Sequence, residues 1–407
     1  MISFILSAIF SYLLSVFRFA KLHIYFDIID ACSNFLYETF FHQAENSYTS
    51  PIGSRHKFFS SKNILPIQNK SVLLHSFWNG YCLWKNKLFQ RIIRHSPLPE
   101  KSIGRIKDNL KQKTFFCTMI QESELVLAQD GSLYHLHLKG EQIADNVILV
   151  GDPQRVDFFK PFFSHIEQET TNREIHSITG ECKGKRLTVL STGMGTDNID
   201  IIINELDAAV NMDLEKRTAK SSHRRLNFIR IGTSGALHSE IPVGSIVASE
   251  YAIGLDGLLN FYKHNSSLFE EDMTEAFCQH AKLASCFAKP YIAQCDNKLM
   301  EKLAFDCHKG ITATAPGFYA PQGRWLTIEP AIDDINGILT SFEYKTNKIL
   351  NFEMETSAIY GLSKVLGHNA LTLCLIIANR QSGTFLNDYK DKMKALIEQV
   401  LERLSQM

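Results

Sequence analysis

The sequence predicts an α/β protein with a central sheet of largely parallel or mixed strands, and two kinds of segment lead to this class. Short apolar runs rich in β-prone residues recur along the chain from residue 145, most of them ending in turns that contain Gly. Between them lie segments whose apolar residues recur at helical spacing. Continuous apolar runs are typical of strands buried on both faces, and strands that alternate with helices indicate an α/β sandwich.

Each element follows from its own pattern. The strands are expected at residues 146–151, 186–195, 228–236, 244–250 and 370–379. The helices are expected at residues 198–212, 355–366 and 388–404, the last of them amphipathic. Because ligands of such folds bind beyond the carboxyl ends of the strands, the motifs that follow these strands are the first candidates for a site.

The composition excludes several classes of protein. The 407 residues include 43 Lys and Arg and 43 Asp and Glu, and 45% are hydrophobic, as in ordinary soluble globular proteins. This excludes a disordered chain and a collagen-like fibre, and the neutral charge gives no support for a nucleic-acid binder. The nine Cys are odd in number and form no CxxC pair, so neither a zinc site nor a disulfide framework is expected. We expect reduced cysteines and a cytoplasmic location.

Two stretches of the chain differ in composition. Residues 1–118 carry 15 Lys and Arg against 6 Asp and Glu, whereas residues 119–407 carry 28 against 37. This predicts a boundary near Met119, between a basic, Phe-rich extension and a domain of residues 119–407. Residues 1–17 are apolar and uncharged, so a weak membrane anchor is one interpretation of the extension, although the run is short for a span. The interpretation we prefer is that the natural protein starts at Met119 and has no membrane association.

Two motifs have the residues of an anion site. In GDPQR (151–155), which follows a strand, Gly151 lets the backbone approach an anion and Arg155 can bind it, although a plain turn with a surface Arg is the alternative. In IRIGTSGA (229–236), Arg230 lies inside an apolar run and needs a partner, because an unpaired buried charge is very costly. A tight loop after it would supply hydroxyl and N–H donors for phosphate, from Thr233, Ser234 and Gly235. The alternative is an internal salt bridge followed by a glycine turn.

Two further motifs suit a sugar and a base. NFEMETSAIYG (351–361) sets two carboxylates, Glu353 and Glu355, at the start of a helix, where they could bind sugar hydroxyls, act as an acid–base pair or stabilise the helix N-terminus. FYAPQGR (318–324) supplies an aromatic ring, an amide and a guanidinium in a Pro- and Gly-containing loop. Their donors and acceptors match the edge of a pyrimidine-like ring.

The order of these blocks resembles the nucleoside phosphorylase family of the uridine phosphorylase type, from about Tyr134 to the C-terminus. The blocks that carry the resemblance are HLHL (135–138), GDPQRV (151–156), NRE (172–174), STGMG (191–195), RIGTSGA (230–236), FYAPQGR (318–324), FEMET (352–356) and NR (379–380). The resemblance implies a three-layer α/β/α sandwich with a central mixed sheet. It also implies a homo-oligomer, a dimer or a hexamer, in which a neighbouring subunit completes each active site.

The resemblance also assigns roles to individual residues. The phosphate would be bound by Gly151, Arg155, Arg230 and Thr233, with Arg173 reaching in from the partner subunit. The ribose would contact Thr233, Met354 and Glu355, with the partner's His135 near the 5′-hydroxyl, for which an ordinary strand histidine is the alternative. The base would contact Ser234, Gly235, Phe318, Gln322 and Arg324. The residues expected to act in catalysis are Arg230, Gln322, Arg324 and Glu355.

The implied activity is the reversible phosphorolysis of uridine to uracil and ribose 1-phosphate. Purine-specific relatives carry an Asp after the late strand, whereas this strand ends in Asn379 and Arg380, so a pyrimidine is favoured. A purine or broad-specificity nucleoside phosphorylase is the first alternative, and a membrane-tethered nucleoside-binding protein without turnover is the second. Nucleoside and inorganic phosphate are the expected substrates, with no cofactor and no nucleic-acid partner.

The sequence departs from the family pattern in three places. Residues 213–226 form a polar, basic insert, expected to be a surface loop. The loop at 320–324 reads APQGR rather than the more usual PGQER. The family's monovalent cation site uses a Glu, a Ser and a backbone carbonyl; Glu174 matches, but Asn198 stands at the Ser position, which puts a structural K⁺ near Glu174 in question.

Overall fold

The computed structural model describes residues 120–407, and the predicted extension with its apolar segment 1–17 lies outside them. The strands are β1 Asn146–Val150, β2 Phe163–Asn172, β3 Ile175–Cys182, β4 Lys185–Ser191, β5 Met212–Asp213, β6 Thr218–Ala219, β7 Asn227–Ala236, β8 Ile246–Gly254, β9 Tyr291–Gln294, β10 His308–Thr314, β11 Glu343–Tyr344, β12 Asn347–Glu353, β13 Asn369–Asn379 and β14 Thr384–Phe385. The α-helices are α5 Pro153–Val156, α6 Thr196–Asn211, α7 Glu271–Ala281, α8 Asn297–Leu303, α9 Ile335–Ser341, α10 Thr356–Leu366 and α11 Lys390–Ser405. The five predicted strands are confirmed as β1, β4, β7, β8 and β13, and the three predicted helices as α6, α10 and α11.

Within residues 120–407, all strands except β5 and β6, which pair only with each other, form one mixed sheet that partly closes on itself. Its order is β11-β12-β10-β8-β13-β7-β1-β4-β3-β2, with β9 paired to β8 and β14 paired to β13. Strand β1 pairs in parallel with β4 and β7, and β13 pairs in parallel with β7 but antiparallel with β8. The C-terminal part of β12 also pairs with β7, so that β7, β12, β10, β8 and β13 form a closed ring. The predicted α/β class with a central mixed sheet is therefore confirmed.

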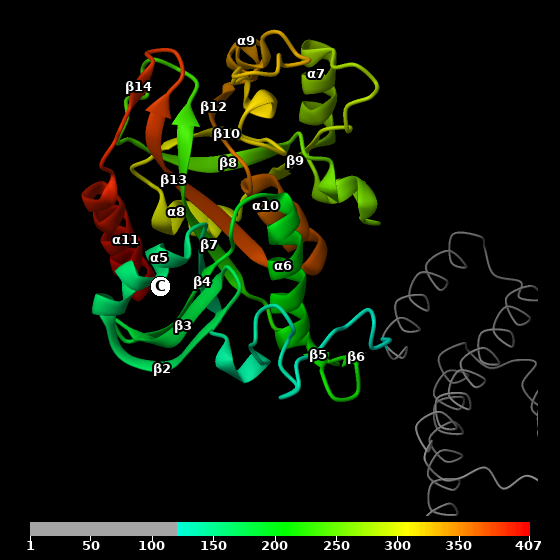
Figure 1. Ribbon diagram of the computed structural model, residues 1–407, viewed down its shortest axis with the longest axis vertical. Coiled ribbons are helices and arrows are strands. Elements are labelled where there is room, and N and C mark those ends of the chain that lie inside the picture. The colour runs from blue at the N-terminus through cyan, green and yellow to red at the C-terminus, as the bar shows by residue number, and fades with distance from the viewer. Residues whose placement is uncertain (1–119) are drawn as a thin grey trace, which may run out of the picture. The chain divides into compact units, whose positions relative to one another are not determined.

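Helices cover the sheet because their apolar faces match its buried side chains. Helix α6 buries Ile199, Ile202, Ile203 and Leu206 on one face, at the spacing of an amphipathic helix. It packs against α10, which contacts β8 and β13, while α11 packs on α8 and β13 (Figure 1). A second apolar cluster lies beneath α7 and α9, where Phe277 meets Phe342 edge to face. Together these clusters fix the strands whose ends carry the site.

Three local predictions are corrected or refined. Residues 233–235 do not form a tight loop, because they continue β7 as an extended strand between β12 and β13. His135 lies in a turn rather than in a strand. The insert contains the short hairpin β5–β6 and then docks on the domain, where the guanidinium of Arg224 donates to the carbonyls of Gly140 (2.8 Å) and Ile143 (2.6 Å). Within residues 120–407, no helix is both long and apolar enough to cross a bilayer.

Candidate active site

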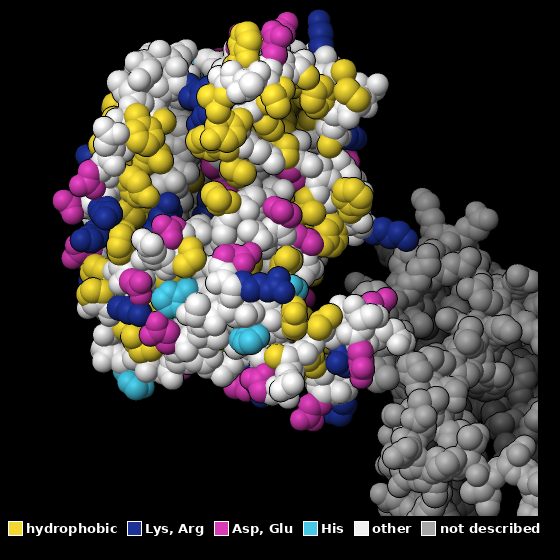
Figure 2. All heavy atoms as spheres, in the orientation of Figure 1, with side chains coloured by type: hydrophobic (Ala, Val, Ile, Leu, Met, Phe, Trp, Pro, Cys, Tyr) yellow, Lys and Arg dark blue, Asp and Glu magenta, His cyan; other side chains and the backbone are white. Residues whose placement is uncertain are grey.

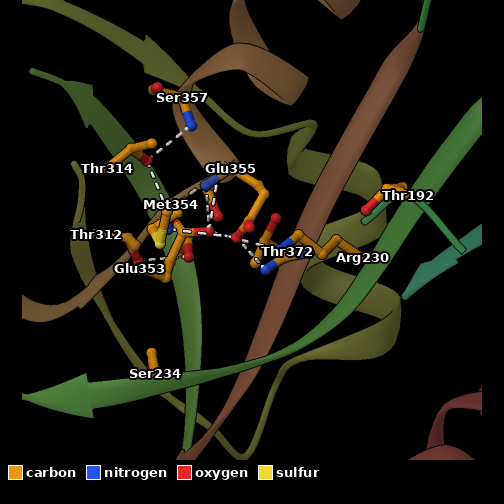
Figure 3. A network of polar contacts seen from close by, with 12 residues as sticks. Thr192, Arg230, Ser234, Thr312, Thr314, Glu353, Met354, Glu355, Ser357 and Thr372 are labelled. Carbon is orange, nitrogen blue, oxygen red and sulfur yellow. Dashed lines mark hydrogen bonds and ion pairs between the residues drawn. The ribbon is translucent and has the colours of Figure 1, made fainter. Parts of the chain in front are cut away.

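The centre of the candidate site is a buried ion-pair cluster at the meeting point of β7, β12 and α10. Arg230 lies on β7 and is only 3% exposed, and its Nη2 donates to Glu355 at 2.5 Å. Its Nε lies 3.5 Å from a carboxylate oxygen of Glu353. The predicted need of Arg230 for a buried partner is confirmed, and Figure 3 shows the guanidinium directed toward both carboxylates. Burial lowers the pKa of Arg230, but the charges of Glu355 and Glu353 outweigh this and raise it.

The two carboxylates have different roles. Glu353, the last residue of β12, accepts from the backbone N–H groups of Glu355 (2.9 Å) and Thr356 (2.9 Å) and from the hydroxyl of Thr314 (2.6 Å). It therefore stabilises the N-terminus of α10, as one of the sequence alternatives proposed. Burial raises its pKa to about 7, the charge of Glu355 adds to this, and Arg230 opposes it. Glu355 instead faces Arg230 and accepts from the backbone N–H of Gly195 at 2.9 Å.

The guanidinium of Arg230 has hydrogen-bond donors that no described residue uses. Its Nε and Nη1 are buried without a hydrogen-bond partner among the described residues, as is the Nε of Arg155. Orphaned charged donors in a protein interior are costly unless something binds them, so both arginines are suited to bind an anion. The side chain of Arg230 also lies across Gly232, where the methyl group of an alanine would be 3.1 Å from the guanidinium carbon. A glycine at 232 thus gives the guanidinium its space.

The ends of two neighbouring strands lie beside this cluster. GDPQR follows β1, and Asp152 caps the one-turn helix α5 by accepting from the N–H of Gln154 at 2.9 Å, so the segment is a helix start and not a plain turn. Arg155 is 8% exposed, so it is not the surface Arg of the alternative interpretation. Strand β4 ends at Ser191, and the Gly-rich residues that follow form the loop before α6. Parallel pairing of β1 with β4 and β7 sets all these segments at one edge of the sheet.

The side chains predicted to bind the base lie on the loop after β10. Gln322 is 5% exposed, and its side-chain carbonyl accepts from Arg324 Nη1 at 2.6 Å. The guanidinium of Arg324 lies 3.7 Å from the centre of the Phe318 ring, and Phe318 is half exposed. Burial, together with the charge of Arg380, lowers the pKa of Arg324 to about 10. The structure therefore brings together the three predicted base-binding side chains, an aromatic face, an amide and a guanidinium.

The end of β13 completes this part of the site. The amide of Asn379 donates to the carbonyls of His238 (2.8 Å) and Ile241 (2.9 Å) and accepts from two backbone N–H groups, so its side chain is fully used in holding the turn. Arg380 lies 3.3 Å from the carbonyls of Gln322 and Gly323. Asn379 thus has a structural role, and Arg380 faces the loop after β10.

Comparison with known proteins agrees with this geometry. Residues 145–405 match the model of a family described as the phosphorylase superfamily. The chain belongs to the phosphorylase superfamily. It is 28% identical over 265 residues to a uridine phosphorylase of Thermococcus kodakarensis, which covers 63% of this chain and 81% of the relative. It is 30% identical over 244 residues to a DeoD-type purine nucleoside phosphorylase of Alkaliphilus metalliredigens, covering 60% and 85%. A crystal structure of a Trypanosoma brucei nucleoside phosphorylase, described as showing uridine phosphorylase activity, superposes with a TM-score of 0.62 at 28% identity, covering 70% of this chain and all of the other.

Two residues that the phosphorylase resemblance assigned lie apart from this cluster. Arg173 is exposed at the tip of the β2–β3 hairpin, with a left-handed φ of 54°, and His135 lies in a turn against α6. Within residues 120–407, no hydrogen bond or ion pair joins either of them to the Arg230 cluster. Their assignment to a partner subunit's site stays a prediction. Thr233 is half-buried on β7, and Ser234 is held by the amide of Asn351 at 2.8 Å.

The two residues that stand at the position of the family's cation site are Glu174 and Asn198. Glu174 and Asn198 do meet, because both lie against Gly193. The amide nitrogen of Asn198 donates to the carbonyl of Met194 at 3.0 Å. The side-chain carbonyl of Asn198 and the carboxylate of Glu174 are oxygen ligands of the kind that a cation takes, so a structural K⁺ near Glu174 stays a prediction.

Sequence reasoning missed the polar residues that support the carboxylates. Thr312 donates to Asn351 at 2.7 Å, and the hydroxyl of Thr314 both donates to Glu353 and accepts from the N–H of Ser357 at 3.0 Å (Figure 3). The sequence does contain a signal for them. Thr312, Thr314 and Asn351 are polar residues inside apolar strands, and a buried polar group needs a hydrogen-bond partner.

Proposed function

We propose that the protein catalyses the reversible phosphorolysis of uridine to uracil and ribose 1-phosphate. The observation that carries this proposal is Arg230, buried against Glu355 with an unpartnered Nη1 and Nε among the described residues, at the same strand edge as Arg155. A guanidinium held by one carboxylate and still able to donate elsewhere is suited to hold phosphate beside a sugar. The uridine phosphorylases among the relatives support the same activity.

Phosphate is the nucleophile in this proposal. One of its oxygens bonds to C1′ of the ribose as the C1′–N1 bond breaks, and the electron pair of that bond leaves with uracil, which then takes up a proton. Arg155, Arg230 and Thr233 would hold the phosphate in place, so that the contribution of the protein is mainly one of positioning. Glu355, fixed by Arg230 and by the N–H of Gly195, would accept a hydrogen bond from a ribose hydroxyl.

The departing base is the group that needs charge stabilisation. Negative charge develops on a uracil carbonyl oxygen as the glycosidic bond breaks, and Arg324 would donate to it, with Gln322 holding the base edge. Stacking of Arg324 on Phe318 keeps the guanidinium plane fixed before the base arrives. The end of β13 carries Asn379, whose side chain holds the turn, in place of a carboxyl group. This favours a pyrimidine over a purine.

The test is uracil release from uridine by the full chain, with and without inorganic phosphate. We expect release only with phosphate, together with formation of ribose 1-phosphate. Release that does not need phosphate would make the protein a hydrolase and overturn the roles of Arg155 and Arg230. Glu355→Gln should abolish most of the activity, whereas Glu402→Gln, which removes a surface partner of Lys183, should leave it intact.

A purine or broad-specificity activity is the second candidate, because DeoD-type purine nucleoside phosphorylases stand among the relatives at similar identity. Inosine is the discriminating substrate. A higher kcat/KM for inosine than for uridine would replace the uridine proposal by this one. Binding of uridine without turnover of either nucleoside would favour a non-catalytic binder.

A further inference from the structure

A single carboxylate on α6 holds the turn that carries His135. Glu205 accepts from the ring Nδ1 of His135 at 2.5 Å, from the backbone N–H of His135 at 3.1 Å and from the backbone N–H of Leu136 at 3.0 Å. Three donors on one carboxylate fix both the backbone and the imidazole plane. Because Nδ1–H faces Glu205, the other ring nitrogen, Nε2, is the one directed to a ligand.

The tip of the β2–β3 hairpin holds the same turn from another side. The amide nitrogen of Asn172 donates to the carbonyls of Tyr134 (3.2 Å) and His135 (2.9 Å), across 37 residues of sequence. The next residue, Arg173, sets its guanidinium 5.6 Å from the centre of the Tyr134 ring. That ring in turn lies edge to face with His135, with 5.0 Å between the ring centres.

These contacts join two residues that have separate ligands. Arg173 carries a charge suited to phosphate, and His135 a ring nitrogen suited to a hydroxyl. Arg173 is exposed, and the His135 side chain is 28% exposed, so both can reach a second molecule. The left-handed backbone of Arg173, which is sparsely populated for residues other than Gly, is held in place by the hairpin on either side.

We propose that Glu205, Asn172 and Tyr134 are positioning residues that hold His135 and Arg173 as one preassembled unit. Contact with the nucleoside 5′-hydroxyl and contact with phosphate are then coupled, because displacing the turn displaces both residues. This inference rests on the proposed function and on the roles that the family resemblance implies for His135 and Arg173, which would reach a neighbouring subunit's site as ligands of nucleoside and phosphate.

The experiment compares Asn172→Ala and Glu205→Gln with matched controls on the same elements. The controls are Gln168→Ala on β2, whose amide contacts Thr170, and Asp200→Asn on α6, whose carboxylate contacts Tyr262 and Asn204. Two quantities are measured for each: the KM for phosphate, and the preference for uridine over 5′-deoxyuridine in kcat/KM. Coupling free energies of the usual size predict that Asn172→Ala raises the KM for phosphate about tenfold and lowers the 5′-hydroxyl preference about tenfold, while the controls change neither.

The two quantities must move together. A change in only one of them, or in neither, overturns the coupling. Adding His135→Ala to Asn172→Ala should remove no further 5′-hydroxyl preference, and a full additional loss would show that Asn172 does not act through His135. If Asn172→Ala or Glu205→Gln does not fold, Tyr134→Leu, at a side chain that is 40% exposed, makes the same paired prediction.

Failure of the inference is distinguishable from failure of the proposed function. A wild-type chain that acts on inosine instead of uridine overturns the uridine proposal, and the coupling is then measured with inosine and 5′-deoxyinosine. For a chain without turnover, calorimetric affinities for phosphate and for the two nucleosides give the same paired comparison. A variant that changes the affinity for phosphate but not the preference for the 5′-hydroxyl, or the reverse, would show that His135 and Arg173 are not held as one unit.

Discussion

The two ends of the candidate site are built in opposite ways. At the end proposed to bind phosphate and ribose, Arg230, Glu353 and Glu355 are almost fully buried and tied to several strands. At the end proposed to bind the base, the loop after β10 exposes large apolar side chains, and Figure 2 shows apolar side chains gathered at the end of the molecule where α7 and α9 lie. The exposed members of this loop are Phe318, Tyr319, Trp325, Leu326 and Ile328.

The difference reflects what each end must do. Buried charges are tolerated only beside opposite charges, so the end of the site built on Arg230, Glu353 and Glu355 has little freedom to change. A loop can alter its shape at low cost to the fold, which makes it the place where base preference can vary. Relatives named for uridine and for purine nucleosides in one superfamily agree with this division.

Arg230→Met should have the largest effect. It leaves Glu355 and Glu353 buried without their cation, so we expect a loss of about 3–5 kcal/mol in the free energy of unfolding. It also removes a charged donor from the reaction, which should cost about 10³-fold in kcat. Lys216→Met, at a surface ion pair with Asp213, is the control and should cost about 0–1 kcal/mol with unchanged kcat. Urea unfolding measures the free energy of unfolding, and a phosphorolysis assay measures kcat. Equal effects of the two variants would contradict the comparison between the two ends of the site.

Arg324→Gln should separate activity from stability. The side chain is on the loop and its partners are Gln322 and the carbonyl of Phe318, so unfolding should change little. Loss of the donor to the departing base should lower kcat by about 10²-fold. A similar loss in folding stability, measured by urea unfolding, would show that the base end is as tightly built as the other.

The pH dependence of stability should report Glu353. Its pKa in the folded protein is raised to about 7 from an ordinary value of 4.5, so the folded state binds the proton more tightly than the unfolded state. Its contribution is therefore fully present below about pH 4.5 and is lost as pH rises through about 7. Relative to Glu353→Gln, which cannot titrate, the wild type should lose stability between about pH 5 and pH 8. A difference between the two proteins that stays flat over this range would argue against the raised pKa.

Phe318→Ala should have the smallest effect. Its ring, on which the Arg324 guanidinium stacks, is half exposed, and an exposed cation–π contact contributes about 0.5–1 kcal/mol, or about two- to fivefold in the KM for the nucleoside. Trp325→Ala removes another exposed aromatic side chain of the loop and should leave KM unchanged. An effect of about tenfold or more at Phe318 would mean that the base rests chiefly on this ring.

Much of this fold could be read from local patterns. The runs around Ile148 and Leu373 are apolar because those strands are buried on both faces, and α6 shows its buried stripe in the spacing of its isoleucines. These signals are strong because each buried position of a strand or helix favours an apolar residue. The prediction of a loop at residues 233–235 was wrong. Thr, Ser and Gly are typical of turns, but pairing with β12 and β13 holds these residues extended.

The sequence by itself determined the α/β class, the order of the motifs and the fact that Arg230 requires a buried partner, because each depends on the residue and its immediate neighbours. Only the tertiary structure decided which carboxylate faces Arg230 and which one caps α10, that Asn379 is used to hold a turn, and that Glu205 and Asn172 hold His135. Those partners lie up to 141 residues apart, and a hydrogen bond between them is set by how the sheet closes. A buried polar group must have a hydrogen-bond partner, and the fold determines which residue provides it.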